Sequence, residues 1–172
     1  MGGAASPKLR PFRPEDADPC LGLFRDCVHR VNSRDYASDQ IEAWASTSID
    51  HKAWGSRFDD RFAYVATEDD CIVGFTDMTR DGHLDRLFVS ANHQGRGIAR
   101  RLVEILLRDA FDHSIEEITT DASITAKPFF ERMGFSVVRE QSVECRGVWM
   151  TNYRMRRAER MKVEGRGMSK NG

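Results

Sequence analysis

Residues 87–110 constrain the fold of this chain more than any other stretch. They open on a short apolar run at residues 87–89, Leu-Phe-Val, whose branched and aromatic side chains favour a strand. Beyond a loop, Ile98, Leu102 and Leu106 recur at helical spacing, with charged side chains on the opposite face. The sequence therefore predicts a strand, a loop and an amphipathic helix in direct succession.

The loop between this strand and helix has the chemistry of an anion site. A helix N-terminus carries unpaired backbone N–H groups and the positive end of the peptide dipoles. Gly95 and Gly97 would let a phosphate approach those groups closely, and Arg96, Arg100 and Arg101 add positive charge. We therefore expect a ligand that carries a pyrophosphate.

Two common nucleotide motifs do not fit this loop. A Walker A loop needs a lysine after its second glycine, and the chain has no lysine between Lys52 and Lys127. A dinucleotide fingerprint needs a third small residue, and although Gly95 and Gly97 begin that pattern, Arg100 stands at the third position. The pyrophosphate must belong to another class of ligand.

Residues 94–99, Gln-Gly-Arg-Gly-Ile-Ala, resemble the pyrophosphate loop Gln/Arg-x-x-Gly-x-Gly/Ala of the GNAT superfamily of acyl-CoA-dependent N-acetyltransferases. A second block, residues 123–135, is similar to the Asn-x-x-Ala…aromatic-Tyr…Gly-Phe segment of the same superfamily. The resemblance covers roughly residues 10–156. It implies direct acetyl transfer from acetyl-CoA, as co-substrate, to an amine of a small molecule or a protein.

The resemblance also implies which residues hold the cofactor. In the family, two central strands splay apart and the pantetheine arm lies in the gap, so its backbone partners here would be Leu87 and Val89. The full set of expected cofactor residues is Leu87, Phe88, Val89, Gln94, Gly95, Arg96, Gly97, Ile98, Ala99, Arg100, Ser123, Ala126, Phe129 and Phe130.

The order of predicted elements gives an α/β fold, with a GNAT-like mixed, mostly antiparallel sheet that is flanked by helices and splayed at the central strands. We expect strands at residues 8–12, 62–66, 72–78, 83–90, 117–121, 135–138 and about 145–155. Helices are expected at about residues 14–31, 38–44, 98 onward and 125–133.

One domain accounts for most of the chain. A length of 172 residues suits a single core, so we expect one GNAT-like acetyltransferase domain over residues 1–156 and a flexible basic tail over residues 157–172. A net charge of −1 gives no reason to expect nucleic acid or a membrane surface as partner. No apolar run approaches ~18 residues, and the first seven residues lack a signal pattern. We expect a cytoplasmic protein, with a homodimer left open.

The four cysteines are too scattered for a metal site or a redox motif. Cys20, Cys27, Cys71 and Cys145 form no C-x-x-C pair and have no histidine at zinc-ligand spacing. We expect buried or idle thiols and no metal.

Two residues of the predicted strand before the loop are candidates for the catalytic base. In family members with a glutamate base, that residue lies six positions before the valine that pairs with pantetheine, which is the position of His83 here. Asp85 lies two residues further on, on the same predicted face with Leu87 and Val89. Either could act through water, and a histidine with its ordinary pKa near ~6.5 suits neutral pH better. The competing interpretation is a turn histidine and a solvated aspartate.

The sequence departs from the family at the general acid. Many members place a tyrosine four residues after the motif alanine, to protonate the departing thiolate, and that position here is Phe130. Ser123, Tyr36 or Tyr153 are conceivable donors, or water supplies the proton. The departure motivates an alternative function, a catalytically weak acyl-CoA-binding sensor module.

Three residues are candidates for contact with the acceptor. Tyr36, Gln40 and Trp44 lie at positions i, i+4 and i+8, so they would share one face if the helix at residues 38–44 extended back far enough. In the family, this region forms one wall of the acceptor site. The alternative interpretation is that the aromatic side chains pack on the core.

Overall fold

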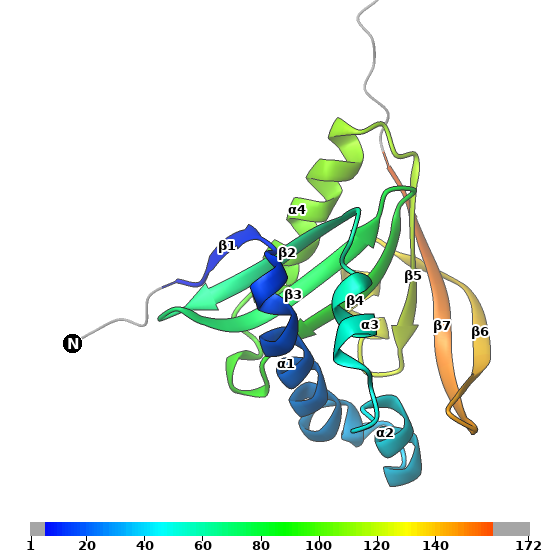
Figure 1. Cartoon of the computed structure of the whole chain (residues 1–172). Helices are drawn as coiled ribbons and strands as arrows, with labels where there is room; N and C mark the ends of the chain where they lie inside the picture. The colour runs from blue at the N-terminus through cyan, green and yellow to red at the C-terminus, as the bar shows by residue number, and fades with distance from the viewer. Residues whose placement is uncertain (1–5, 160–172) are drawn as a thin grey trace, which may run out of the picture.

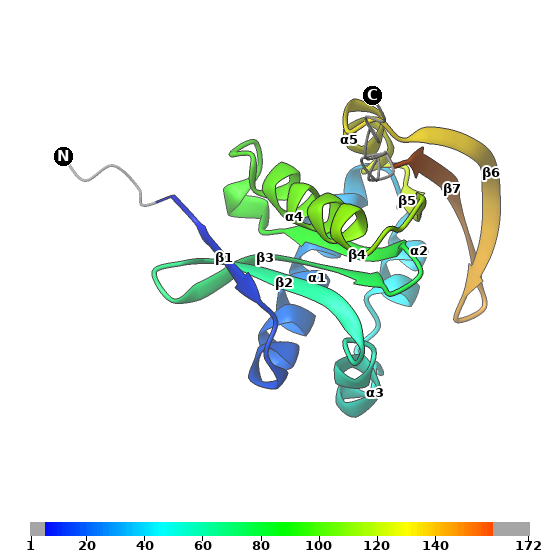
Figure 2. The same cartoon turned by 90° about the horizontal axis from the view of Figure 1, so that it is seen from above.

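The computed structural model describes residues 6–159 of the chain. A seven-stranded sheet in the order β1-β2-β3-β4-β5-β7-β6 forms the middle layer, with helices on both faces (Figures 1 and 2). The strands are β1 (Lys8–Pro11), β2 (Arg61–Glu68), β3 (Cys71–Thr79), β4 (His83–Val89), β5 (Glu117–Ser123), β6 (Ser136–Cys145) and β7 (Val148–Ala158). The helices are α1 (Ala17–Arg30), α2 (Ser38–Trp44), α3 (His51–Ser56), α4 (Ile98–Asp112) and α5 (Lys127–Arg132). Short 3-10 turns cover Pro14–Asp16, Asn32–Arg34 and Ala91–His93.

All neighbouring strands pair antiparallel except β4 and β5, which are parallel. This confirms the predicted mixed, mostly antiparallel sheet flanked by helices. Helices α1, α2 and α3 cover one face, and α4 and α5 cover the other (Figure 2).

Helix α4 forms because its apolar stripe matches the sheet beneath it. Ile98, Leu102 and Leu106 are at most 2% exposed, and charged side chains occupy the solvent face. The helix approaches closely at Gly74 of β3, where an added Cβ would lie 3.2 Å from the side chains of both Ile98 and Leu102. The predicted strand, loop and helix are therefore packed as one unit.

The opposite face is an aromatic core. Phe24 of α1 contacts the rings of Trp54 and Phe88, and Phe75 of β3 packs beneath them. Trp54 lies on α3, a six-residue helix that the sequence analysis missed, because so short a segment shows no apolar repeat. Its start is fixed by Asp50, whose carboxylate accepts a hydrogen bond from the backbone N–H of Ala53 at 2.7 Å.

The sheet is joined at its centre by a very short contact. Strands β4 and β5 pair only at His83 with Thr119 and at Leu84 with Thr120. The Thr120 hydroxyl also donates to the Leu84 carbonyl at 2.9 Å, and the Thr119 N–H donates to the Gly82 carbonyl at 3.0 Å. Beyond this junction the two strands diverge, as the resemblance implied.

A β-bulge in β4 lies immediately after the junction. Asp77 of β3 pairs with Arg86, whereas the next residue, Met78, pairs with Leu84. Asp85 is therefore the extra residue on β4, and the alternation of side chains is interrupted there.

The bulge makes the predicted strand faces wrong. Leu84, Leu87 and Val89 all lie in the apolar clusters under α4, whereas Arg86 and Phe88 lie among the aromatic rings of the other face. Strict alternation would instead place Leu84 on one face with Arg86 and Phe88. It had also placed the bulged aspartate with Leu87 and Val89.

The last two strands are longer than predicted. They form a hairpin in which β6 is the sheet edge, and β7 continues to Ala158, where Ala158 and Arg157 pair with Glu117 and Ile118 of β5. The first two residues assigned to the basic tail are therefore strand. Residues 160–172 of the predicted tail lie outside the described residues.

The junction generates a stability prediction at Gly82. Its φ is +99°, and an added Cβ would lie 2.6 Å from the Glu117 carbonyl oxygen and 2.7 Å from the Ile115 side chain. We expect Gly82→Ala to lower the free energy of unfolding by about 3 kcal/mol or more, because strain at positive φ adds to a clash with backbone.

Gly147→Ala is the matched control, since Gly147 has φ +80° with no atom within 4 Å of the added Cβ. It should cost only the strain, about 1–2 kcal/mol. Urea unfolding measures both variants, and equal losses would contradict the tight fit at Gly82.

Candidate functional site

Two cavities meet where β4 and β5 diverge. The first, of about 870 Å³, follows the gap between the strands to the N-terminus of α4 and the residues of α5. The second, of about 630 Å³, lies between the face covered by α1, α2 and α3 and the β6–β7 hairpin. Five residues line both cavities, so the two are adjacent at the gap: Trp44, Asp85, Phe88, Asp121 and Ser123.

The loop at the far end of the first cavity is built from two glycines with positive φ. Gly95 has φ +72° and Gly97 has φ +76°, and an added Cβ at either would meet no protein atom within 4 Å. Glycine is therefore needed for the backbone turn and leaves open space on the cavity side. The side-chain amide of Gln94 donates to the Val89 carbonyl at 2.7 Å, which ties the loop to the end of β4.

The arginines around the loop divide into two groups. Arg96 donates to Glu68 at 2.9 Å, and Arg101 donates to the Pro7 carbonyl at 2.6 Å. Neither is among the described residues that line the cavities. Arg96 is thus engaged by Glu68, and its contact with a diphosphate stays a prediction.

Positive charge in the first cavity comes from other positions. Arg100 lines it as expected, and three arginines that the sequence analysis missed line it too: Arg34, Arg132 and Arg157. They come from the turn after α1, from α5 and from β7. Only the fold brings them together, so no local motif could have indicated them.

Most of the residues that we expect to contact the cofactor border the first cavity. With the exception of Arg96, every residue expected at the cofactor lines the first cavity. The Val89 carbonyl, one of the groups expected to pair with pantetheine, also accepts from the Cys27 thiol at 3.0 Å. Phe130 is 3% exposed and contributes its ring to the cavity wall.

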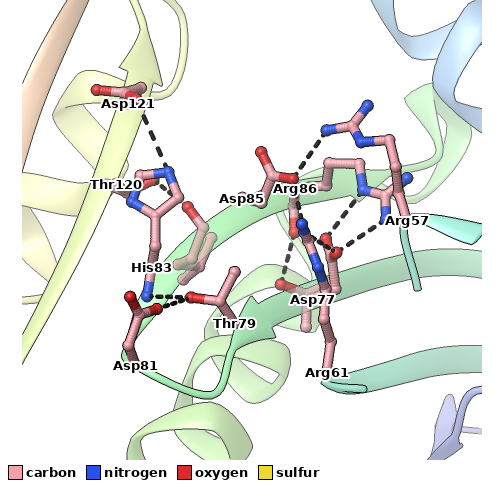
Figure 3. A network of polar contacts seen from close by, with 12 residues as sticks. Arg57, Arg61, Asp77, Thr79, Asp81, His83, Asp85, Arg86, Thr120 and Asp121 are labelled. Carbon is pink, nitrogen blue, oxygen red and sulfur yellow. Dashed lines mark hydrogen bonds and ion pairs between the residues drawn. The ribbon is translucent and has the colours of Figure 1, made fainter. Parts of the chain in front are cut away.

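The two candidate bases occupy different environments. His83 lies at the junction, where its Nδ1 is 2.8 Å from the Thr119 hydroxyl and its Nε2 is 3.7 Å from Asp121 (Figure 3). It is not among the described residues that line the cavities, whereas Asp121 lines both. Asp121 was missed because an isolated aspartate near a strand end carries no sequence signal.

Asp85, the other candidate, is held by two arginines. Its Oδ2 accepts hydrogen bonds from Arg61 at 2.7 Å and from Arg57 at 2.8 Å (Figure 3). Burial acts to raise the pKa of Asp85, but the two guanidinium groups outweigh it and lower the pKa below its usual value. A carboxylate of lowered pKa is a weak proton acceptor.

The same arginines continue into a buried ion cluster. Asp77, which is fully buried, accepts from Arg61 at 2.8 Å and from Nε and Nη2 of Arg86 at 3.0 and 2.8 Å. The Arg86 guanidinium lies over the rings of Phe58 and Trp54, with its carbon 4.0 and 4.6 Å from their centroids. We call this set the Asp77 cluster; its members are Arg57, Arg61, Asp77, Asp85 and Arg86.

The three candidate acceptor contacts lie in three different settings. Trp44 lines both cavities and packs against Phe24 and Phe88. Tyr36 precedes α2 and lines the second cavity, but its hydroxyl donates to a backbone carbonyl of β7 at 2.7 Å and accepts a backbone N–H after β5 at 2.9 Å. Gln40 bonds the backbone of Ala37 and of Trp149 and is not among the residues described as lining either cavity, so its contact with the acceptor stays a prediction.

The cysteines are dispersed. Burial raises the pKa of both Cys20 and Cys27 to about 12, so neither thiol ionises near neutral pH. Cys71 is exposed, and Cys145 lines the second cavity.

Residues 6–159 contain no group of three or more side chains placed to hold a metal ion. No helix in that part of the chain is long and apolar enough to cross a membrane.

The chain belongs to the GNAT family of acetyltransferases. Residues 32–157 match the family described as acetyltransferase (GNAT) domain, and this family transfers an acetyl group from acetyl-CoA. The chain is 39% identical to YafP, an uncharacterized N-acetyltransferase of Escherichia coli K12, over 87% of this chain and 94% of that protein.

Two further relatives agree. The peptidyl-lysine N-acetyltransferase YjaB of Salmonella typhimurium LT2 is 26% identical over 81% of this chain and 90% of that protein. The crystal structure of a GCN5-related N-acetyltransferase from Rhodopseudomonas palustris superposes with a TM-score of 0.85 and 29% identity, covering 92% of this chain and 99% of that one.

The loop geometry predicts the effect of a side chain at Gly97. We expect Gly97→Val to abolish the thermal stabilisation that saturating acetyl-CoA gives the wild type, because the new side chain would extend into the open space beside the loop, where we expect the diphosphate. Gly147→Val is the control, with a similar φ and open surroundings outside both cavities. Stabilisation retained in the Gly97 variant would place the diphosphate elsewhere.

The scattered cysteines predict independence from metals and disulfides. The rate of acetyl transfer, measured as release of the CoA thiol, should be unchanged after dialysis against a chelator and should persist in protein kept reduced. Loss of activity with chelator, restored by one added metal, would contradict this.

Proposed function

We propose that this chain acetylates the amine of a small molecule, which enters through the second cavity and meets the acetyl group at the gap. The observation that supports this is the meeting of two cavities at one point of a splayed sheet, with the family loop at the far end of the first. A volume of about 630 Å³ is in the range of small-molecule sites.

Acetyl-CoA would lie along the first cavity. Its diphosphate would bind the N–H groups of the loop at Gly95 and Gly97, and Arg100, Arg132 and Arg34 would neutralise its phosphates. Its pantetheine would pair with the edge of β4 that β5 leaves open beyond Leu84. The thioester would then lie beside the residues shared by the two cavities.

His83 is the better candidate for the base that takes the proton of the amine. Asp85 is engaged by two guanidinium groups, whereas a histidine accepts a proton readily near neutral pH. Asp121 borders both cavities, and its carboxylate lies 3.7 Å from Nε2 of His83. It would stabilise the imidazolium that forms when His83 takes the proton, and it would hold the amine through a bridging water molecule. Asp121 thereby acts as a positioning residue.

Ser123 is the candidate donor to the departing thiolate. It lines both cavities, and its oxygen accepts from the Ala126 N–H at 3.0 Å, which leaves its own proton to donate. Tyr36 uses its proton on a β7 carbonyl, and Tyr153 uses its proton on Glu140 at 3.2 Å. Both are therefore weaker candidates.

Two other functions follow from specific observations. Phe130 cannot donate a proton, which favours an acyl-CoA-binding sensor of little activity. The name of the relative YjaB points to lysine side chains of proteins as acceptors. A panel of small amines and lysine peptides, assayed by thiol release from acetyl-CoA, tests all three. Binding of acetyl-CoA without turnover of any amine would favour the sensor.

The base assignment predicts an unequal effect of two substitutions. We expect His83→Ala to lower kcat/KM by about 10²-fold or more at little cost in acetyl-CoA affinity, and the acidic limb of the pH profile to flatten. Asp85→Asn should have the smaller effect on the pH profile, because that carboxylate stays ionised across the assay range.

If Asp85→Asn loses more of kcat/KM, and His83→Ala stays within a few-fold of the wild-type value, the base is Asp85. If neither matters, the amine arrives neutral and positioning alone does the catalysis. Circular dichroism of both variants separates these outcomes from unfolding.

A further inference from the structure

One buried arginine that lines the second cavity has a guanidinium with hydrogen-bonding capacity to spare. Arg86 lines that cavity and is 4% exposed. Its Nε and Nη2 bind the two carboxylate oxygens of Asp77, whereas its buried Nη1 has no hydrogen-bond partner within residues 6–159. A buried donor on a charged group is costly to leave unpaired, so a ligand atom that accepts from it gains affinity.

The guanidinium is fixed in place. Phe58 and Trp54 lie against it, and Asp77 grips one edge with two bonds, so Arg86 cannot turn to another partner without breaking that arrangement. Trp54 also lines the cavity. A rigid planar donor held in this way is suited to a carboxylate.

The charges around the cavity leave room for one anion. The Asp77 cluster contains three arginines and two aspartates, so it carries one positive charge in excess. Asp121 is matched by Arg154, whose Nε lies 2.8 Å from it. Asp50, which caps α3, and Arg146 also line the cavity, and their opposite charges cancel.

We propose that the acceptor is an amine that also bears a carboxylate, held by Nη1 of Arg86, on an apolar or aromatic body. The body would contact Trp44, Trp54 and Phe88, which line the cavity. That the ligand has an amine rests on the proposed function. That it has a carboxylate rests on the contacts of Arg86 alone.

The spacing along β4 favours a short acceptor. Arg86 and Phe88 are two residues apart, which is about 7 Å along a strand, and Phe88 borders the gap where the acetyl group would lie. An amine several bonds from its carboxylate, as in 4-(aminomethyl)benzoate, spans that distance. The side-chain amine of a lysine inside a peptide has no carboxylate so placed.

Matched pairs of amines test the carboxylate. Phenylalanine is compared with phenethylamine, and 4-(aminomethyl)benzoate with benzylamine, by kcat/KM from thiol release. In the wild type we expect the carboxylate to raise kcat/KM by about tenfold or more in at least one pair, the usual worth of a hydrogen bond to a charged group. Equal or lower values with the carboxylate in both pairs, or a preference for lysine peptides, would overturn the proposal.

Two conservative variants assign the effect to Arg86. Arg86→Lys keeps a positive charge beside Asp77, but a lysine has no second edge with which to bind a ligand while it binds Asp77. The ratio of kcat/KM with the carboxylate to kcat/KM without it should therefore fall by about tenfold. Arg61→Lys perturbs the same cluster from a residue that is not described as lining either cavity, so the ratio should persist. A ratio unchanged in Arg86→Lys, or lost equally in both variants, would remove Arg86 from the site.

A binding readout separates this proposal from the proposed function. Benzoate should raise the melting temperature of the wild type more than benzamide does, and Arg86→Lys should lose the difference. If amines that lack a carboxylate are turned over and adding a carboxylate gives no benefit, the anion site is overturned and the acetyltransferase function still stands. Benzoate binding that depends on Arg86, without turnover of any amine, supports the site while the proposed function fails. The wild-type measurements decide the matter even where Arg86→Lys does not fold.

Discussion

A contact of two residue pairs between the central strands determines the whole arrangement. At His83 and Leu84 the sheet is continuous, and one residue further along β4 the pairing with β5 has ended. Were the pairing to continue, the backbone of β5 would fill the gap and the two cavities would not meet. The unpaired edge of β4 is the kind of strand edge that proteins usually cover, and here a strand-like cofactor arm can cover it.

The Asp77 cluster is better understood as a device for geometry than as a source of stability. Burying charged groups costs as much desolvation energy as their attraction returns, so such clusters contribute little net stability and a large penalty when one member is lost. Here the cluster fixes Asp85 at the bulge and Arg86 at the cavity. Its effect is also pH-dependent: because the folded pKa of Asp85 is lowered, its contribution is complete above ~pH 4 and is lost as the pH falls through the folded value.

The local pattern of the sequence predicted the elements that are long or strongly periodic. The loop at Gly95 and Gly97, helix α4 and the β2–β3 hairpin all have periodic flanks or turn residues, and they are where the sequence analysis placed them. Helix α3 was missed because six residues carry no period. The faces of β4 were wrong because one extra residue at Asp85 shifts the alternation, and a bulge leaves no mark in composition.

Long-range partners could not be predicted for a related reason. Arg34, Arg132 and Arg157 line one cavity but come from three separate elements, and nothing in their own neighbourhoods indicates a shared ligand. Arg96, which stands inside the motif, turns instead to Glu68 at the end of β2.

That contact has a consequence for the cost of binding. Glu68 holds both Arg96, at 2.9 Å, and Nε2 of His93, at 3.1 Å, so the residues on either side of Gln94 are anchored to the β2–β3 hairpin. These contacts restrain the loop. If the diphosphate binds there as proposed, less conformational entropy is lost on binding, and more of the interaction energy remains as affinity. The end of β2, far from the reacting atoms, would then contribute to the strength of cofactor binding.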